Sequence, residues 1–378
     1  MTLSADQFRQ SARAWLADHV PNEPAPRDGK AARDFALAWQ RTQVAGGWAG
    51  LAWPKAVGGQ ALSIQEQIIW FEECARAQAP SPLGPLFVGL NHAGPTLFAC
   101  GTPEQQATHL PPIIAGEVLW CQGFSEPGAG SDLAGVRTRG RVDGDSLIID
   151  GQKLWSSYAD IADWQEVLVR TDPDSSGHAG LSWVILPMRA DGVTVRPIRN
   201  LAGAQSFCEV FYDSVRVPLD HVVGGLHNGW ATAMSTLSFE RGTATLPLLI
   251  ELVARIETLC ADCSRERHQL RAHLVGLRAE AAAILAMNYR FALDCDRGVP
   301  DASGSMLRLS FAELAQRATS AAIDLYGIAA PEVLGLHGWG YEYLHAFTET
   351  IAGGTAEIQR NIIAERVLGL PKEPRARR

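Results

Sequence analysis

Hydrophobic and polar positions divide the chain into a helical part, a part rich in short strands, and a second helical part. Up to about residue 117, apolar residues recur at helical spacing. One such stripe, expected to be buried, consists of Ile64, Ile68, Phe71 and Ala75. A hydroxyl residue followed three positions later by Gln or Glu predicts a helix start. Such starts fall at Ser4, Ser63 and Thr102.

The middle of the chain has a strand-like pattern. Short apolar runs rich in β-branched and aromatic residues predict strands at 146–149, 167–169, 183–186 and 209–212. Two dipeptides typical of turns, Asp143-Gly144 and Asp150-Gly151, flank the first run. After about residue 226, Ala- and Leu-rich runs at 264–296 and 303–326 are typical of helices packed in a bundle.

This order predicts an α+β multidomain protein. We expect an N-terminal all-α domain over residues 1–117 and a middle β-barrel or β-sandwich domain over 118–226. The C-terminal domain, 227–378, is expected to be a four-helix bundle.

Composition narrows the possible partners. The net charge is −8 and the isoelectric point is about 5.7, which argues against nonspecific binding to nucleic acid or to an anionic membrane. No apolar run approaches the ~20 residues that span a bilayer, and the N-terminus lacks the apolar core of a signal peptide. Seven scattered cysteines suggest reduced thiols, so we expect a cytoplasmic protein.

A metal site is not expected. Cys260 and Cys263 have the spacing of a zinc or redox pair, but no second pair and no histidine cluster follows them. We interpret both as small apolar residues on a helix.

Four segments carry candidate chemistry. Residues 120–132 read as a strand that runs into a glycine-rich turn, where Ser125 and Ser131 could bind a ligand or simply face solvent. Trp155 and Ser157 lie in a second segment, residues 151–157, in which the tryptophan is either core or cofactor wall. The other two segments are 238–243, which contains Glu240, and 351–361.

Together these segments resemble the acyl-CoA dehydrogenase family over nearly the whole chain. The resemblance implies FAD-dependent α,β-dehydrogenation of an acyl-CoA thioester, with electrons passed to an electron-transfer flavoprotein or a similar acceptor. It places Ser131 and Arg241 near the substrate. The implied flavin-binding residues are Phe124, Ser125, Trp155, Ser156, Ser157, Thr355 and Glu357.

The resemblance also implies which group is the catalytic base. Many family members carry a glutamate where this chain has Gly353, but a smaller group carries the base in an earlier Glu-Arg pair, which Glu240-Arg241 matches. Glu240 is therefore expected to remove the α-proton from an enclosed position that raises its pKa. The backbone N–H of Gly353 is expected to bind the thioester oxygen. Glu349 is the alternative base.

The chain departs from the family where typical members contact a neighbouring subunit's FAD. It lacks the Arg-x-x-Phe-Gly motif in the stretch around Cys260–His268, and Asp324 replaces a glutamine in a later segment. Bacterial steroid-degrading members of the family are often α2β2 heterotetramers in which a partner chain completes the FAD site, and such an assembly would account for both departures. We therefore expect a catalytic chain that needs a second acyl-CoA dehydrogenase-like chain, and a bulky acyl group such as a sterol side chain or ring fragment. The alternative is a diverged homo-oligomer that binds FAD weakly or differently.

Two other functions stay open. The chain could be a non-catalytic subunit that completes another chain's site, although Glu240 argues against this. It could also be a dehydrogenase or oxidase of the same fold that acts on carrier-protein thioesters. The sequence does not identify the acyl group, the electron acceptor or the partner.

Overall fold

The computed structural model describes residues 4–239, 246–297, 303–334 and 338–372. The chain forms two compact units. The first, called the sheet unit here, contains residues 11–63 and 78–240. The second, called the helical unit, contains residues 1–10, 64–77 and 241–378.

An eight-stranded sheet is the centre of the sheet unit, with the order β6-β7-β3-β2-β4-β5-β8 and β1 paired with β4. β1 and β2 each run parallel to β4, and the other pairs are antiparallel. The strands are β1 (Trp120–Gly123), β2 (Arg139–Asp143), β3 (Ser146–Ser157), β4 (Trp164–Arg170), β5 (Leu181–Pro187), β6 (Val193–Ile198), β7 (Phe207–Pro218) and β8 (Val222–Val223).

Helices of the same unit pack on this sheet through a core in which Trp53, Leu97 and Trp183 are buried. The capping box predicted at Thr102 is confirmed, because its hydroxyl accepts from the Gln105 N–H at 3.2 Å and its own N–H donates to the Gln105 side chain at 3.0 Å. The helical segments are α1 (Ala5–His19, shared with the helical unit), α2 (Gly29–Gly46), η1 (Lys55–Val57), η2 (Gly89–Ala93), α4 (Gly94–Cys100), α5 (Pro103–Ile114), η3 (Leu133–Gly135), η4 (Leu219–His221) and α6 (Gly229–Phe239).

The four predicted strands are confirmed within β3, β4, β5 and β7, and Asp143-Gly144 begins the turn between β2 and β3. The second predicted turn, at Asp150-Gly151, is wrong. These residues lie inside β3, where the pairing with β7 shifts between Ile149 and Gly151. Gly151 is needed there because a Cβ would lie 2.7 Å from Thr138 Oγ1. The dipeptide therefore forms a bulge in a continuous strand.

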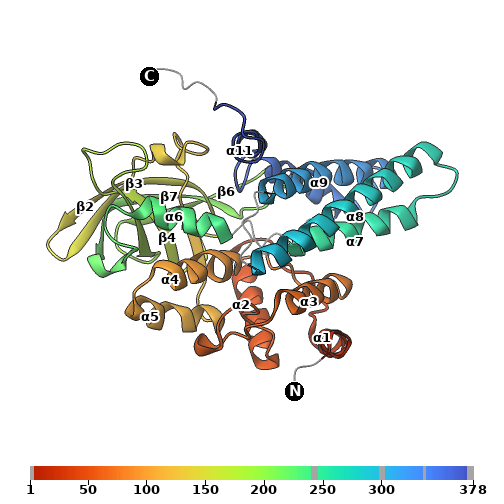
Figure 1. Ribbon diagram of the computed structural model, residues 1–378, viewed down its shortest axis with the longest axis horizontal. Helices are drawn as coiled ribbons and strands as arrows, with labels where there is room; N and C mark the ends of the chain where they lie inside the picture. The colour runs from red at the N-terminus through yellow and green to blue at the C-terminus, as the bar shows by residue number, and fades with distance from the viewer. Residues whose placement is uncertain (1–3, 240–245, 298–302, 335–337, 373–378) are drawn as a thin grey trace. The chain divides into compact units, whose positions relative to one another are not determined.

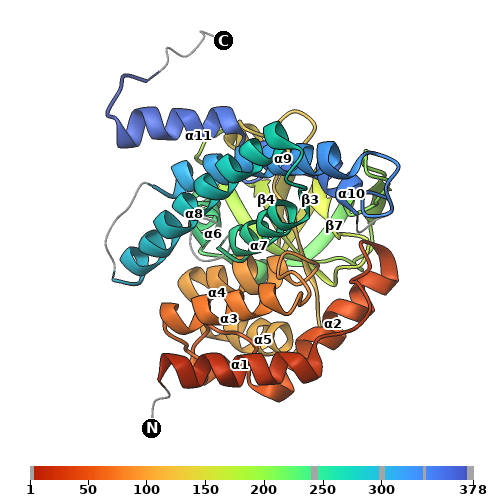
Figure 2. The same cartoon turned by 90° about the vertical axis from the view of Figure 1, so that its right-hand side faces the viewer.

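In the helical unit, α7, α8 and α9 pack side by side, as Figures 1 and 2 both show. Their buried core includes Ile256, Leu277 and Leu314. The predicted capping box at Ser4 is confirmed by its hydrogen bonds with Gln7. The other helical segments of this unit are α3 (Ile64–Arg76), α7 (Leu246–Asp262), α8 (His268–Asp296), α9 (Gly304–Tyr326), α10 (Trp339–Ala346), η6 (Phe347–Thr350), α11 (Ala356–Ile362) and η7 (Ile363–Val367).

Helix α3 begins at Ile64 as predicted, but the predicted buried stripe is wrong beyond that residue. Ile68, Phe71 and Ala75 are only partly buried. The fully buried positions are Ile64, Gln67, Ile69, Trp70 and Glu73. Hydrophobicity alone misplaced the face, because Glu73 is buried with an ion pair to Arg9, 3.0 Å away.

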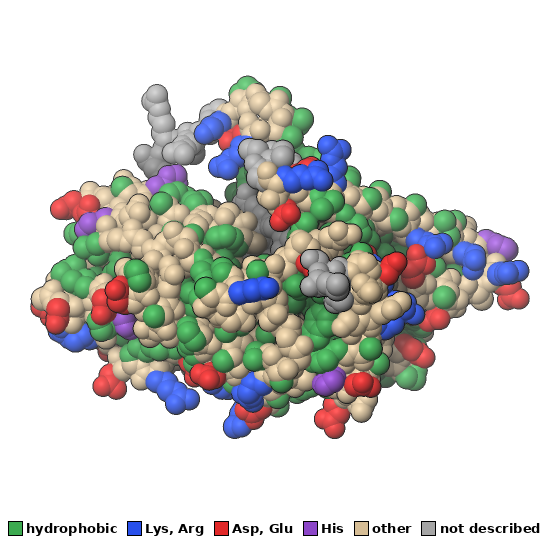
Figure 3. Space-filling model, turned by 60° about the horizontal axis from the view of Figure 1, so that its bottom comes forward, with side chains coloured by type: hydrophobic (Ala, Val, Ile, Leu, Met, Phe, Trp, Pro, Cys, Tyr) green, Lys and Arg blue, Asp and Glu red, His purple; other side chains and the backbone are tan. Residues whose placement is uncertain are grey.

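The predicted fold class is confirmed: helical segments, then a sheet, then a helical bundle. The three domain boundaries remain predictions. Within the described residues, no helix is both long and apolar enough to span a membrane. On the face drawn in Figure 3, acidic and basic side chains are interspersed rather than gathered into a patch of one sign.

Candidate active site

The first segment of the site follows β1, as the sequence predicts. Phe124 is buried in the core of the sheet unit, Ser125 is half-buried, and Ser131 is exposed. Between them, Glu126 and Ala129 exchange two backbone hydrogen bonds of 2.9 and 3.1 Å, which close a tight turn. The segment therefore leaves the core at Phe124 and becomes accessible at the two serines.

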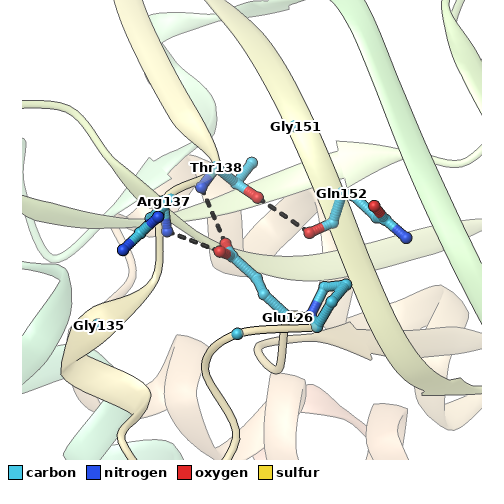
Figure 4. A pocket seen from close by; sticks show the side chains of 8 residues that line it. Glu126, Gly135, Arg137, Thr138, Gly151 and Gln152 are labelled. Carbon is cyan, nitrogen blue, oxygen red and sulfur yellow. Dashed lines mark hydrogen bonds between the residues drawn. The ribbon is translucent and has the colours of Figure 1, made fainter.

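A buried ion pair anchors this segment to β3. Lys153 Nζ, which is inaccessible to solvent, donates to Glu126 Oε1 at 2.8 Å and to the Phe124 carbonyl at 2.9 Å. The Glu126 carboxylate also accepts the backbone N–H groups of Arg137 at 2.7 Å and Thr138 at 2.9 Å, as Figure 4 shows. Two charges can be buried here because each has several hydrogen-bond partners.

Burial dominates the pKa of the lysine, whereas pairing and hydrogen bonds together outweigh burial in the pKa of the glutamate. Burial lowers the pKa of Lys153 to about 8, against the attraction of Glu126. Burial alone would raise the pKa of Glu126, but the attraction and hydrogen bonds of Lys153, together with the donors at residues 137 and 138, hold it below its usual value. Sequence patterns did not predict this pair. The available signal was a lysine directly before Leu154 and Trp155 in a strand-like run, since a lysine that is buried in a strand needs a partner of opposite charge.

An open pocket of about 320 Å³ lies beside the ion pair, and Figure 4 shows its lining. Its wall includes Glu126, Arg137, Thr138 and Gln152, with Gly135 and Gly151 between them. Thr138 Oγ1 donates to the Gln152 carbonyl at 3.2 Å and ties the two sides together. The Glu126 carboxylate is already satisfied by three donors, so it contributes to the shape of this pocket rather than to ligand binding.

The second segment, at the end of β3, exposes a tryptophan. Trp155 is 55% exposed and has φ of +63°, at a second register shift between Lys153 and Ser156. A bulky residue rarely adopts this left-handed conformation, and large aromatic side chains are usually buried. The ring meets that of Phe207 edge-on, with the two centroids 6.1 Å apart. The fold thus maintains a strained backbone that holds this ring at the surface of the unit.

The structure brings the two segments together. The Leu154 N–H donates to the Ser125 carbonyl at 2.9 Å, directly beside Trp155. Ser157 is half-buried, whereas Ser156 is buried and accepts a long hydrogen bond of 3.4 Å from Gln165. Within the described part of the chain, the hydroxyls of Ser125 and Ser157 have no hydrogen-bond partner. Two open hydroxyls and one exposed ring therefore lie on adjoining segments.

The C-terminal segment lies in the helical unit, on the loop between η6 and α11. Gly353 and Gly354 have φ of +63° and +89°. Thr355 caps α11, since its hydroxyl accepts the Ile358 N–H at 3.2 Å. The Glu357 side chain is 79% exposed.

Glu349, the alternative base, is engaged in an ion pair. Its carboxylate lies 2.8 Å from Arg308 Nη1, and the two side chains are only 19% and 14% exposed. A base must accept a proton from substrate, and this carboxylate already accepts from a guanidinium. Glu240 and Arg241, the preferred base and its neighbour, lie outside the described residues, directly after the end of α6 at Phe239.

The stretch in which the family's inter-subunit arginine is missing makes contacts within this chain. Arg267 donates to the carbonyls of Asp324 and Leu325, both at 2.7 Å, and so caps the C-terminus of α9. The Tyr326 hydroxyl bonds to the Asp262 carboxylate at 2.5 Å. These contacts commit Arg267 to its own chain.

Comparisons with known proteins agree with this geometry. Residues 2–117, 121–215 and 227–368 match the N-terminal, middle and C-terminal domains of acyl-CoA dehydrogenases. The chain therefore belongs to the acyl-CoA dehydrogenase family, an oxidoreductase family, as the resemblance predicted.

Individual relatives extend over almost the whole chain. The acyl-CoA dehydrogenase IpdE1 of Mycobacterium tuberculosis is 40% identical, with 97% of this chain and 98% of that protein covered. A variant of the Tcur3481-Tcur3483 steroid acyl-CoA dehydrogenase is 30% identical with a TM-score of 0.86, over 98% of this chain and 99% of that one. The ChsE4-ChsE5 complex of Mycobacterium tuberculosis is 30% identical with a TM-score of 0.83, over 99% and 100%.

Members of this family are flavoproteins, and the sheet unit fits a flavin. A flat apolar ring system needs an accessible aromatic or apolar wall, and its polar edge needs hydrogen-bond donors. The exposed ring of Trp155 would suit such a wall, and the open hydroxyls of Ser125 and Ser157 would suit such donors. The side chains of Phe124 and Ser156 face the protein interior, so any contact they make with a flavin would come from their main chains.

Proposed function

We propose that this chain catalyses the FAD-dependent α,β-dehydrogenation of an acyl-CoA with a bulky acyl group, such as a sterol side chain or ring fragment. The observation that carries the proposal is Trp155, held exposed on a strained backbone beside the open hydroxyls of Ser125 and Ser157. Flavin, when bound, supplies the acceptor for the hydride that leaves the β-carbon. The electrons then pass to an electron-transfer flavoprotein or a similar acceptor.

Each of the proposed site residues has its own role in this reaction. The Glu240 carboxylate takes the α-proton, and the Gly353 N–H donates to the thioester oxygen, where negative charge develops. Trp155 covers the flavin and excludes water. Ser131 and Arg241 bind the CoA thioester, and Thr355 and Glu357 contribute to the flavin site from the C-terminal segment.

The glycine at position 353 favours the assignment of a bulky acyl group. In its place many family members carry a glutamate side chain, and its absence leaves space near the reacting carbons. The names of the relatives point the same way, since one structural neighbour is called a steroid acyl-CoA dehydrogenase.

The test compares substrates and one engineered side chain. With flavin bleaching as the readout, wild type should oxidise a steroid ring-fragment CoA or sterol side-chain CoA faster than octanoyl-CoA. Gly353→Glu should lower the rate with the bulky substrate much more than with octanoyl-CoA. Gly353→Ala, which adds a methyl group but no carboxylate, is the control for the strain of a side chain at positive φ. Equal rates with bulky and linear substrates in wild type would refute the acyl-group assignment.

We also propose that a second, different acyl-CoA dehydrogenase-like chain completes the flavin site in a cytoplasmic α2β2 assembly. Two negative charges on the FAD pyrophosphate require compensation, for which arginine is well suited. This chain lacks the family's arginine motif, and the nearby Arg267 caps α9 of its own chain instead. One structural neighbour was solved as a complex of two different chains, ChsE4 and ChsE5.

Flavin content tests the assembly. The chain expressed alone should retain little FAD, and co-expression with its partner should give two FAD per four chains. A tetramer of this chain alone, with one FAD per subunit and full activity, would refute it. If FAD is bound but neither Glu240→Gln nor Glu349→Gln lowers the activity of the assembly, the chain is the non-catalytic subunit instead.

A further inference from the structure

The loop before α11 is fixed by hydrogen bonds to its carbonyl groups. Arg308 of α9 donates through Nη1 to the Glu349 carboxylate at 2.8 Å. Its Nη2 donates to two main-chain carbonyls, those of Glu349 at 2.9 Å and Ala352 at 3.1 Å. One guanidinium thus holds both ends of the four-residue stretch that leads to Gly353.

A second side chain holds the next peptide. Gln359 of α11, which is 2% exposed, donates to the Gly353 carbonyl at 2.9 Å and more weakly to the Gly354 carbonyl at 3.4 Å. A Cβ at Gly354 would lie only 2.7 Å from the Gln359 Nε2 atom. The two carbonyl groups on either side of the Gly353 N–H, those of Ala352 and Gly353, are therefore both anchored.

The Gly353 N–H itself stays open. Among the described residues it has no acceptor, whereas the N–H groups of Ile351 and Ala352 both donate to the Thr348 carbonyl, at 3.0 and 2.8 Å. An open donor between two anchored carbonyls is a prepared hydrogen-bonding position.

Peptide geometry links this donor to Arg308. The Ala352 carbonyl and the Gly353 N–H belong to the same planar trans peptide, so they point in opposite directions. A hydrogen bond that fixes the carbonyl therefore fixes the N–H, directed away from Arg308. Because the Arg308 guanidinium is a cation, it also polarises this peptide and makes the Gly353 N–H a stronger hydrogen-bond donor.

We propose that Arg308 is a positioning residue that aims the Gly353 N–H at the thioester oxygen, with Glu349 as its counter-ion. This rests on the proposed function, in which that N–H stabilises the enolate-like oxygen. Arg308 touches no reacting atom. It acts through one peptide unit, and lysine could not replace it fully, because a single ammonium group cannot span a carboxylate and two carbonyls in one plane.

The first experiment tests the positioning without substrate or flavin. Hydrogen–deuterium exchange of the peptide that covers residues 349–355 is compared in the full-length wild type, Arg308→Gln and Arg308→Lys. Exchange at the Ile351 and Ala352 amides should rise clearly in Arg308→Gln and less in Arg308→Lys. The matched control is Arg360→Gln, which breaks an exposed ion pair between α11 and Glu313 of α9, the helix that also carries Arg308. If Arg308→Gln and Arg360→Gln give the same exchange as wild type, the proposal is overturned.

The second experiment uses the flavin-loaded assembly and acetoacetyl-CoA, whose acidic α-protons allow an enolate to form without hydride transfer. The enolate is followed by its visible absorption beside oxidised flavin while pH is varied. Wild type should lower the apparent pKa of the bound ligand below its value in water. In Arg308→Gln the bound enolate should be stabilised roughly tenfold to hundredfold less than in wild type, because the substitution weakens the Gly353 N–H as a donor but does not remove it. Arg308→Lys should recover part of it.

The outcomes separate the two proposals. If wild type lowers the ligand pKa and Arg308→Gln lowers it equally, the role of Arg308 is refuted while the proposed function stands. If wild type does not lower it at all, the oxyanion role of Gly353 fails, and with it the reaction proposed for this site. The exchange result then reports only on how the loop is held.

Discussion

In the sheet unit, the segment proposed to face the flavin is held from inside by the buried pair Glu126–Lys153. In the helical unit, the loop around Gly353 is held from its edges by Arg308 and Gln359. The first arrangement displays side chains, namely an exposed ring and two hydroxyls. The second displays a main-chain N–H. A flat cofactor needs a wall of fixed side chains, whereas a developing oxyanion needs a directed donor, and a glycine can supply one without occupying space.

The two arrangements also differ in what they cost to break. The pair in the sheet unit is inaccessible to solvent on its lysine side, so each charge depends on the other. The pair in the helical unit, Arg308–Glu349, retains some exposure. We expect changes in the buried pair and core of the sheet unit to affect folding, and changes in the C-terminal loop or in the exposed Trp155 to affect chemistry and flavin binding. Four predictions test this distinction, from the largest effect to the smallest.

The largest expected effect tests whether the catalytic base is Glu240 or a residue of the C-terminal loop, Glu349. Glu240→Gln should slow flavin reduction by substrate by roughly 10²–10⁴-fold or more, because the general base is lost, while FAD stays bound. Glu349→Gln should have a much smaller effect, since Glu349 serves as a partner of Arg308. Stopped-flow flavin bleaching measures both. The reverse order, with Glu349→Gln slow and Glu240→Gln near wild type, would move the base to the loop.

The second prediction tests the buried pair. Lys153→Met should lower the free energy of unfolding by about 3–5 kcal/mol, because Glu126 is left without its cation. The double variant Glu126→Gln/Lys153→Met should recover much of this loss. Urea unfolding followed by tryptophan fluorescence measures it. Lys30→Met is the control, since it breaks the exposed Lys30–Asp34 pair of α2 and should change stability by less than about 1 kcal/mol.

The third prediction uses pH to test how a buried histidine of the sheet unit affects stability. Burial, and to a smaller extent repulsion from His221, lowers the pKa of His109 to about 4. The unfolded chain, with a histidine pKa near 6.5, binds this proton more readily. Stability is therefore full above about pH 6.5 and falls as the pH drops toward 4, by up to about 3 kcal/mol.

His109→Phe should reduce that slope and keep the edge-on ring contacts with Trp120 and Trp164, at 5.4 and 4.9 Å. Urea midpoints at pH 7 and pH 5 give the comparison. An unchanged difference between the two pH values in the variant would show that other groups cause the slope.

The smallest effect on stability, and the most selective one, concerns Trp155. Trp155→Gly should leave the unfolding free energy of the flavin-free chain unchanged or raise it by about 1 kcal/mol, because glycine relieves the left-handed backbone. The same change should lower FAD occupancy, since the aromatic wall is lost. Ser214→Gly, at another residue with positive φ on β7, should relieve strain without changing flavin content. Unchanged flavin content and fluorescence in Trp155→Gly would show that the ring does not face the cofactor.

Local patterns determined much of the architecture. The capping boxes at Ser4 and Thr102 and the strands of the sheet unit could be predicted, because each depends on a few neighbouring residues. Motif resemblance likewise selected the family and the residues proposed for catalysis. Patterns failed where a distant partner decides the outcome. Gly151 looks like a turn residue until its close approach to Thr138, which directly precedes β2, is known.

The sequence by itself thus determined the order of helices and strands, the family, and the candidates Glu240, Gly353 and Trp155. Only the tertiary structure decided how these groups are supported. Lys153 and Glu126 are separated by 27 positions, and Arg308 and Ala352 by 44, so no local spacing indicates that they meet. The physical reason is that a hydrogen bond or ion pair depends on distance and direction in space, and those are fixed only when the sheet and the helices have packed.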